Sequence, residues 1–143
     1  MQAALAGLSP AALVFKPAPN EWSIHEVILP MADSELMGVT RLHMLIAQPG
    51  TMLMTYDSTK WGEALGYKEQ SAEDALQIFQ LLRRKTHLLL KRLPDQVFAH
   101  SVRHPAYPEP YTIDQWLEIY TGHVPEHIQQ IQQTLKALKA AGQ

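Results

Sequence analysis

Three long stretches of the chain carry apolar residues every three or four positions, and the two connections between them lack this pattern. Such spacing is typical of amphipathic helices that bury one face. The first stretch runs from Ser23 to Gln48, the second from Ser71 to Pro94, and the third from Thr112 toward the C-terminus. Almost no segment alternates residue by residue, as a half-buried strand would. The pattern therefore predicts an all-α protein built on three long helices.

Each predicted helix begins at a residue whose side chain can cap the free amides of the first turn. Ser23 followed by Glu26, and Thr112 followed by Gln115, have the spacing of a capping box, in which each side chain bonds the other residue's backbone amide. Ser71 is the cap expected for the second helix. The core-facing residues of that helix are predicted to be Ala75, Ile78, Phe79, Leu82, Leu89, Leu90 and Leu93.

Two prolines fall inside the predicted helices, Pro30 in the first and Pro125 in the third. A proline has no amide hydrogen, so it cannot bond the carbonyl four residues earlier, which here belongs to Glu26 and to Thr121. The lost bond and the steric clash cost about 3 kcal/mol unless the helix bends. The sequence therefore predicts a kink at each proline.

The connections 48–70 and 95–111 are long for a simple helical bundle. The first contains glycine-bearing stretches and the second contains Pro105, Pro108 and Pro110, so both are expected to run over the surface with short turns of their own. Connections of this length suit a bundle whose neighbouring helices are not all antiparallel.

Composition narrows the possible classes of protein. A chain of 143 residues, 46% hydrophobic and 18% charged, predicts one globular domain spanning residues 1–143. The net charge of −2 and the lack of a long basic cluster argue against a nucleic-acid partner, and no apolar run approaches the roughly 20 residues that span a bilayer. With no cysteine, the chain has neither disulfides nor thiolate ligands. We expect a cytoplasmic protein without nucleic-acid or membrane partners.

The chemistry that stands out is a histidine pair in the third helix. His123 and His127 are four residues apart, so both imidazoles can point toward one ion from successive turns. A zinc site needs three or four ligands, and two are half of one. The alternative is an inward polar pair that is hydrogen-bonded in the core near Tyr120 and Ile131. Spacing alone leaves both interpretations open.

Several segments together resemble the DinB/YfiT-like family. They are Trp22-Ser-Ile-His-Glu-Val27, Ala32-Asp-Ser-Glu35 and His123-x-x-x-His-Ile-x-Gln-Ile131, which occur in the order that the family has. The resemblance implies a four-helix bundle with long crossover loops, here with a shortened first helix. It also implies a divalent metal held by three histidines. Two of these match His123 and His127, but the position of the first is Pro30.

Glu26 and Asp33 are the nearest residues that could replace the missing ligand, because each lies about one turn from position 30. Zn, Ni or Mn would be the expected metal, and the alternative is that no metal binds. The sequence assigns no catalytic residue.

Two functions follow from the resemblance. In the first, the protein has a degenerate metal site, binds metal weakly or not at all, and binds a small-molecule ligand or itself. In the alternative, it is a divalent-metal-dependent hydrolase or thiol-dependent transferase that uses His123 and His127. A homodimer is expected by analogy, because a shortened first helix leaves apolar surface that self-association could bury.

Overall fold

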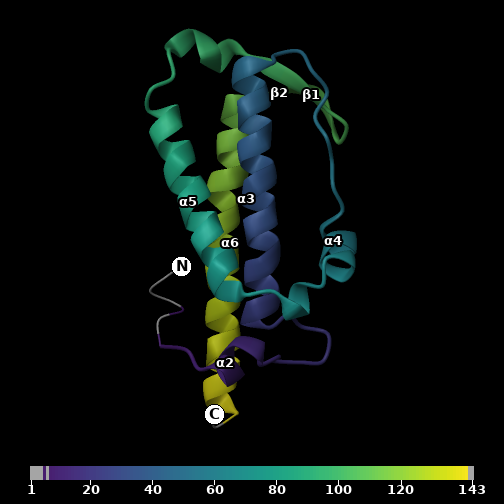
Figure 1. The fold of residues 1–143 in the computed structure, drawn as a ribbon, viewed down its shortest axis with the longest axis vertical. Helices are drawn as coiled ribbons and strands as arrows, with labels where there is room; N and C mark the ends of the chain where they lie inside the picture. Colours follow the sequence, from purple (N-terminus) through teal and green to yellow (C-terminus); the bar gives the residue numbers. More distant parts are fainter. Residues whose placement is uncertain (1–4, 6, 142–143) are drawn as a thin grey trace.

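The computed structural model describes residues 5 and 7–141, apart from the side chains of residues 108 and 109. Its frame consists of three long helices that run side by side, namely α3 (Ile24–Ala47), α5 (Ala72–Leu90) and α6 (Ile113–Ala140) (Figure 1). The short helix α2 (Pro10–Val14) precedes them. Helix α3 contacts both other long helices and α2, and it is therefore the central helix of the fold.

The predicted caps are present. The amide of Ser23 donates to Glu26 Oε2 at 2.9 Å, and the amide of Glu26 donates to Ser23 Oγ at 3.2 Å. Thr112 and Gln115 form the second capping box, at the start of α6. Ser71 Oγ accepts the hydrogen bond from the third residue of α5, at 3.1 Å. The three helix starts predicted from the sequence are confirmed.

Both internal prolines lie within continuous helices. Helix α3 extends through Pro30 and helix α6 extends through Pro125 without an interruption of the helical assignment. Leu29 and Met31, which flank Pro30, are buried. We infer that this packing holds the helix together across the missing hydrogen bond, since tertiary burial outweighs local propensity. Helix α5 ends at Leu90, three residues before Leu93, which was its expected last residue.

The two long connections contain structure that the sequence pattern indicated only as turns. The first holds helix α4 (Ser58–Ala64) and the 3₁₀ turn η1 (Tyr67–Glu69). The second holds the 3₁₀ turn η2 (Asp95–Ala99) and an antiparallel hairpin of β1 (Ser101–His104) and β2 (Tyr107–Thr112). The hairpin was not predicted, because its strands are too short to show a clear alternation.

The hairpin also anchors the first connection. The amide of Leu53 donates to the carbonyl of Arg103 and the amide of Arg103 donates to the carbonyl of Thr51, both at 2.8 Å. These two bonds explain how the connection crosses from the end of α3, past the hairpin, toward α4 (Figure 1).

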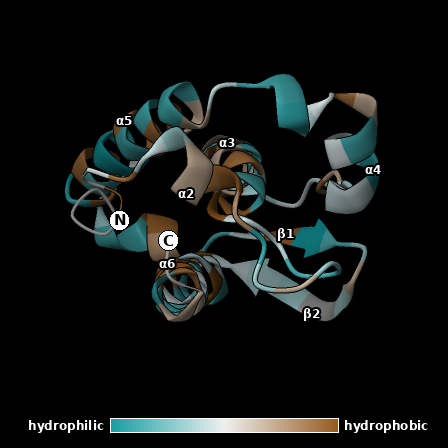
Figure 2. Ribbon diagram, turned by 90° about the horizontal axis from the view of Figure 1, so that it is seen from below, coloured by the Kyte–Doolittle hydropathy of each residue, from teal (hydrophilic) through white to brown (hydrophobic). Residues whose placement is uncertain are grey.

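The buried residues form two apolar clusters at opposite halves of the bundle. One joins the first half of α3 to α5, η1 and Ile131 of α6. The other joins the second half of α3 to the hairpin and to Trp116 and Tyr120 of α6. The view along the helices shows α3 in the middle, with α5 and α6 beside it (Figure 2). Between the two clusters, the helices carry polar side chains at positions that face the core.

A candidate site in the polar middle of the bundle

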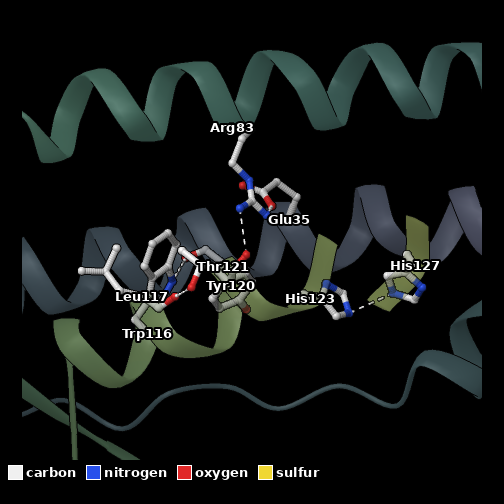
Figure 3. Close-up of polar contacts among 9 residues, drawn as sticks. Glu35, Arg83, Trp116, Leu117, Tyr120, Thr121, His123 and His127 are labelled. Carbon is white, nitrogen blue, oxygen red and sulfur yellow. Dashed lines mark hydrogen bonds and ion pairs between the residues drawn. The ribbon is translucent and has the colours of Figure 1, made fainter. Parts of the chain in front are cut away.

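His123 and His127 lie on successive turns of α6, between the apolar residues Tyr120 and Ile131. Their Nε2 atoms are 3.1 Å apart, and the two rings meet edge to face (Figure 3). Nδ1 of His127 is 3.3 Å from Gln130 Oε1. Both histidines are half-buried. The two imidazoles therefore converge, as the sequence spacing predicted.

The environment of His123 favours the neutral imidazole. Burial is the main cause of the lowered pKa of His123, and the neighbouring His127 lowers it further. Glu126 raises this pKa and the positive charge of Arg83 lowers it. A neutral ring can accept a hydrogen bond or bind a metal through one nitrogen.

A buried ion pair lies close to the histidines in the middle of the bundle (Figure 3). Arg83 of α5 reaches Glu35 of α3, with Nη2 2.5 Å from Oε2, and only 1% of the Glu35 side chain is exposed. Nη1 of Arg83 also donates to the carbonyl of Tyr120 at 2.8 Å, so this one side chain links all three long helices. Its guanidinium carbon lies 5.2 Å from the centre of the Phe79 ring.

The ion pair does not satisfy all of its own polar atoms. Within the described residues, two buried atoms of the pair have no hydrogen-bond partner, Glu35 Oε1 and Arg83 Nε. The same holds for Thr86 Oγ1, three residues after Arg83 in α5. Burial raises the pKa of Glu35, while the charge and hydrogen bond of Arg83 lower it. The direction is upward overall, because the loss of hydration outweighs the pairing.

The two candidate replacement ligands have other partners. Glu26 belongs to the capping box and pairs with Lys16, whose Nζ is 2.8 Å from Oε1. Asp33 accepts a hydrogen bond from the hydroxyl of Tyr67. Among the residues that the structure describes, no three His, Asp or Glu side chains gather where they could hold a metal ion.

The histidine pair by itself fits a shared ion. Two nitrogens bound to one tetrahedral zinc at 2.0–2.1 Å would be about 3.3 Å apart, which is close to the observed 3.1 Å. The rest of the donor set does not fit. Pro30 stands where the resemblance requires a third ligand, and its side chain has no donor atom. The described residues therefore provide two ligands of a centre that requires at least three.

A pocket of about 520 Å³ lies beside Pro30. One wall is formed by Trp22, which precedes α3, and by Glu26 and Pro30 in the first turns of α3. Tyr67 and Glu63 line the opposite wall, which is formed by α4 and η1. The position that lacks a metal ligand thus borders a space large enough for a small molecule.

Sequence reasoning missed the functional interest of Glu35 and Arg83. The sequence analysis named Glu35 only as the last residue of the Ala32-Asp-Ser-Glu35 motif, and it gave Arg83 no role. A signal was available, because each residue interrupts an apolar stripe, Glu35 between Met31 and Val39 and Arg83 after Phe79. When each of two helices has a charged residue at a position predicted to face the core, the two residues can be expected to form a buried pair.

Fold and site together define a class of protein, a helical bundle with long crossovers and a histidine pair in its polar middle. The family model described as the DinB superfamily matches residues 1–131. The chain belongs to the DinB superfamily, as its sequence motifs indicated.

Its relatives agree with this assignment. The chain is 27% identical over 110 residues to a protein of Bacillus subtilis named "Putative metal-dependent hydrolase YfiT", and the match covers 77% of this chain and 62% of that protein. It is 26% identical over 116 residues to "Putative metal-dependent hydrolase BH0277" of Halalkalibacterium halodurans, covering 81% of this chain and 67% of that protein. The chain thus spans somewhat over 60% of the length of these relatives.

A solved structure confirms the fold. The chain superimposes on YfiT from Bacillus subtilis, described as an unusual four-helix bundle, with a TM-score of 0.86 and 23% identity over 96% of this chain and 79% of that one. The predicted four-helix-bundle class is therefore correct. Separately, none of the helices in the described residues is long and apolar enough to cross a membrane.

Proposed function

We propose that this protein is a DinB-superfamily bundle with a degenerate metal site, which binds divalent cations weakly at most and takes a small ligand in the pocket beside Pro30. The observation that carries this proposal is Pro30 itself. It replaces the first of three ligands, and Glu26 and Asp33 are held by Lys16 and Tyr67 rather than directed at the histidines. A two-ligand site holds a divalent ion poorly, since the remaining positions must be filled by water.

In this proposal the histidine pair is a structural polar contact. His123 and His127 share one hydrogen bond across the 3.1 Å gap, in which one neutral ring donates and the other accepts. Gln130 can hold the tautomer of His127 through Nδ1.

The pocket suggests the chemistry of the ligand. Trp22, Pro30 and Tyr67 provide apolar surface. The charged residues of the lining are three carboxylates and one ammonium, namely Glu26, Glu63, Glu69 and Lys68. An apolar body with an attached amine would match this combination. Benzylamine, benzyl alcohol and benzoate share one ring and differ in charge, so they form a matched set of probes. We expect only benzylamine to raise the melting temperature, and Trp22→Ala to abolish the effect. If benzoate raised the melting temperature by the same amount, the proposal that the ligand is positively charged would be refuted.

The degenerate metal site is tested by restoring the missing ligand. The protein and its Pro30→His variant are purified without a His-tag, equilibrated with Zn, Ni or Mn, separated from free metal by gel filtration, and measured by mass spectrometry. We expect little metal in the original protein and close to one equivalent in Pro30→His. Pro30→Ala is the control, because it removes the proline without adding a ligand.

A second candidate function is supported by the separation of the two imidazoles, which also fits one shared ion. In that case His123 and His127 would hold a divalent metal for a hydrolase, as the names of the relatives suggest. One equivalent of metal in the original protein, lost in His127→Ala, would establish the metal site that this candidate requires and refute the proposal of a degenerate site.

A further inference from the structure

A second polar cluster lies in the half of the bundle that contains the hairpin, around Arg41 of α3. Nη1 of Arg41 donates to the hydroxyl of Tyr120, and Nη2 donates to the carbonyl of Met54, both at 3.4 Å. These bonds are long, because an N–H donor usually lies about 2.9–3.0 Å from its acceptor. The guanidinium is therefore held only weakly by its two neighbours.

Two polar atoms of this cluster have no hydrogen-bond partner within the part of the chain that the structure describes. They are Nε of Arg41 and the hydroxyl oxygen of Tyr111, and both are buried. The whole Tyr111 residue is only 1% exposed. A buried polar group without a partner has lost its hydration without compensation. Both groups are donors that an incoming acceptor could use.

The groups around the guanidinium come from three other elements and carry no negative charge. Burial raises the pKa of Tyr111 on β2 and of Tyr120 on α6, while the nearby charge of Arg41 acts on both in the opposite direction. Burial lowers the pKa of His104 on β1, and the charge of Arg41 lowers it further. Arg41 is thus surrounded by two phenols and a neutral imidazole.

Arg41 has no carboxylate partner in the described structure. None of the ion pairs among the described residues includes it. Glu35, the buried acid on the same helix, already pairs with Arg83. The polar interior of the bundle therefore contains two arginines and one carboxylate, an excess of one positive charge. Charged side chains are rarely buried without an opposite charge, so a bound anion would stabilise this arrangement.

The local packing fixes Tyr120 beside Arg41. A Cβ at Gly38, three residues before Arg41, would lie 2.3 Å from a ring carbon of Tyr120, so the ring packs directly against the backbone of α3. Trp116 stacks on the same ring at a centroid distance of 4.7 Å, and its Nε1 donates to the carbonyl of Gly38 at 2.8 Å (Figure 3). The hydroxyl of Tyr120 is therefore positioned before any ligand binds, which favours binding.

We propose that Arg41, Tyr111 and Tyr120 form a binding site for a small carboxylate. A carboxylate is planar and can accept two parallel hydrogen bonds from one edge of a guanidinium, and the unpartnered Nε lies on such an edge. The hydroxyl of Tyr111 would donate to the same ligand. One negative charge matches the excess charge of the interior, whereas a phosphate group carries up to two.

The surroundings also limit the size of the ligand. Tyr111 and Tyr120 are 1% and 3% exposed, so we expect room for a short aliphatic carboxylate and not for a ring attached directly to the carboxyl group. The ligand would enter beside Met54, whose side chain is exposed. None of these residues belongs to the histidine pair or to the pocket beside Pro30. The proposal therefore succeeds or fails separately from the proposed function.

The first test compares acetate, acetamide and methylphosphonate, which share one methyl group and differ in the charge and shape of the rest. Saturation-transfer NMR detects the methyl protons near neutral pH, with the ionic strength held constant. We expect acetate to bind with a dissociation constant of about 1 mM, and the other two to bind at least about tenfold more weakly.

The second test locates the site. Arg41→Met should weaken acetate binding at least about tenfold. Arg84→Met is the matched control, because it removes the same charge from an exposed position of α5, and it should leave acetate binding unchanged. Tyr111→Phe should weaken binding by about fivefold to tenfold, since one hydrogen bond to a charged group is lost.

Tyr111→Phe has a second readout that a purely structural role would not give. Without acetate, this variant should melt at the temperature of the original protein or above it, because the hydroxyl has no partner in the protein to lose. With acetate, it should gain less in melting temperature than the original protein does. This variant also decides the question if Arg41→Met does not fold.

Three results would overturn the proposal. One is the absence of acetate binding at about 10 mM, ten times the expected dissociation constant. Another is acetate binding that Arg41→Met or Tyr111→Phe leaves unchanged. The third is tighter binding of methylphosphonate than of acetate, which would assign the site to phosphate groups instead of carboxylates.

Discussion

Replacing Arg83 by methionine should reveal how strongly the bundle depends on its buried ion pair. The substitution keeps an unbranched chain of similar length, but removes the charge beside Glu35, whose side chain is 1% exposed. It also removes the donor to the carbonyl of Tyr120. Removing one member of a buried pair costs about 3–5 kcal/mol, because the remaining charge is left without a partner in a region of low dielectric constant. A protein with a total stability of about 5–15 kcal/mol would lose a large part of it.

The loss should depend on pH in a defined direction. Burial raises the pKa of Glu35, and the contact with Arg83 lowers it, so the Arg83→Met variant should have a still higher pKa at this carboxyl. A carboxyl whose pKa is higher in the folded state than in the unfolded state binds its proton first in the folded state. Protonation then stabilises the fold as the pH falls. The deficit of Arg83→Met should therefore be largest near pH 8 and shrink toward pH 5.

Urea denaturation followed by circular dichroism measures both effects, with the slope of the transition as a check that the unfolding remains two-state. The control is the double variant Glu35→Met, Arg83→Met, which replaces the pair by apolar side chains. It should be much more stable than Arg83→Met alone, because no unpaired charge remains. A loss below about 1 kcal/mol in Arg83→Met, or a loss that does not change with pH, would refute this account of the ion pair.

Two further predictions concern local packing and capping. Gly38→Ala should destabilise the fold by about 1–3 kcal/mol despite the better helix propensity of alanine, because the added Cβ would lie 2.3 Å from a ring carbon of Tyr120. Gly122→Ala, where nothing lies within 4 Å of the new Cβ, should instead gain about 0.5–1 kcal/mol in thermal melts. Partial burial raises the pKa of Glu26, but its bonds with Lys16 and the capping serine outweigh this and lower the pKa overall. The stability that Glu26 contributes should be present above pH 5 and be lost as the pH falls through its folded pKa. In Glu26→Gln the melting temperature should therefore depend less on pH between about pH 5 and 3. An unchanged pH profile in that variant would contradict the capping argument.

The helix starts could be predicted because capping is a local interaction. Ser23 and Glu26 are three residues apart, and their mutual hydrogen bonds form within one turn whatever the rest of the chain does. The hairpin at 101–112 could not be predicted in this way. Its pairing depends on contacts between the two strands and with the connection near Thr51. A strand of four residues is too short for these contacts to produce a recognisable alternation of apolar and polar positions.

In the candidate site, too, local features could be predicted and contacts between distant segments could not. The four-residue spacing of His123 and His127 is enough to place both on one face of α6, and the proline at position 30 excludes a third histidine there. The sequence did not show that Glu26 would pair with Lys16 or that Asp33 would accept a bond from Tyr67, since both partners come from other segments.

By itself, the sequence determined the three helices, their starting points, the family and the two converging histidines, because these depend on residues within a turn or two of one another or on a motif read directly. Only the tertiary structure decided which side of α5 is buried. The two faces of that helix are both partly apolar, so hydrophobic spacing alone could not choose between them. In the structure Ala75, Phe79 and Thr86 face the core, Arg83 pairs with Glu35 of α3, and Ile78, Leu81 and Leu88 are exposed, so the prediction of a core position for Ile78 was wrong.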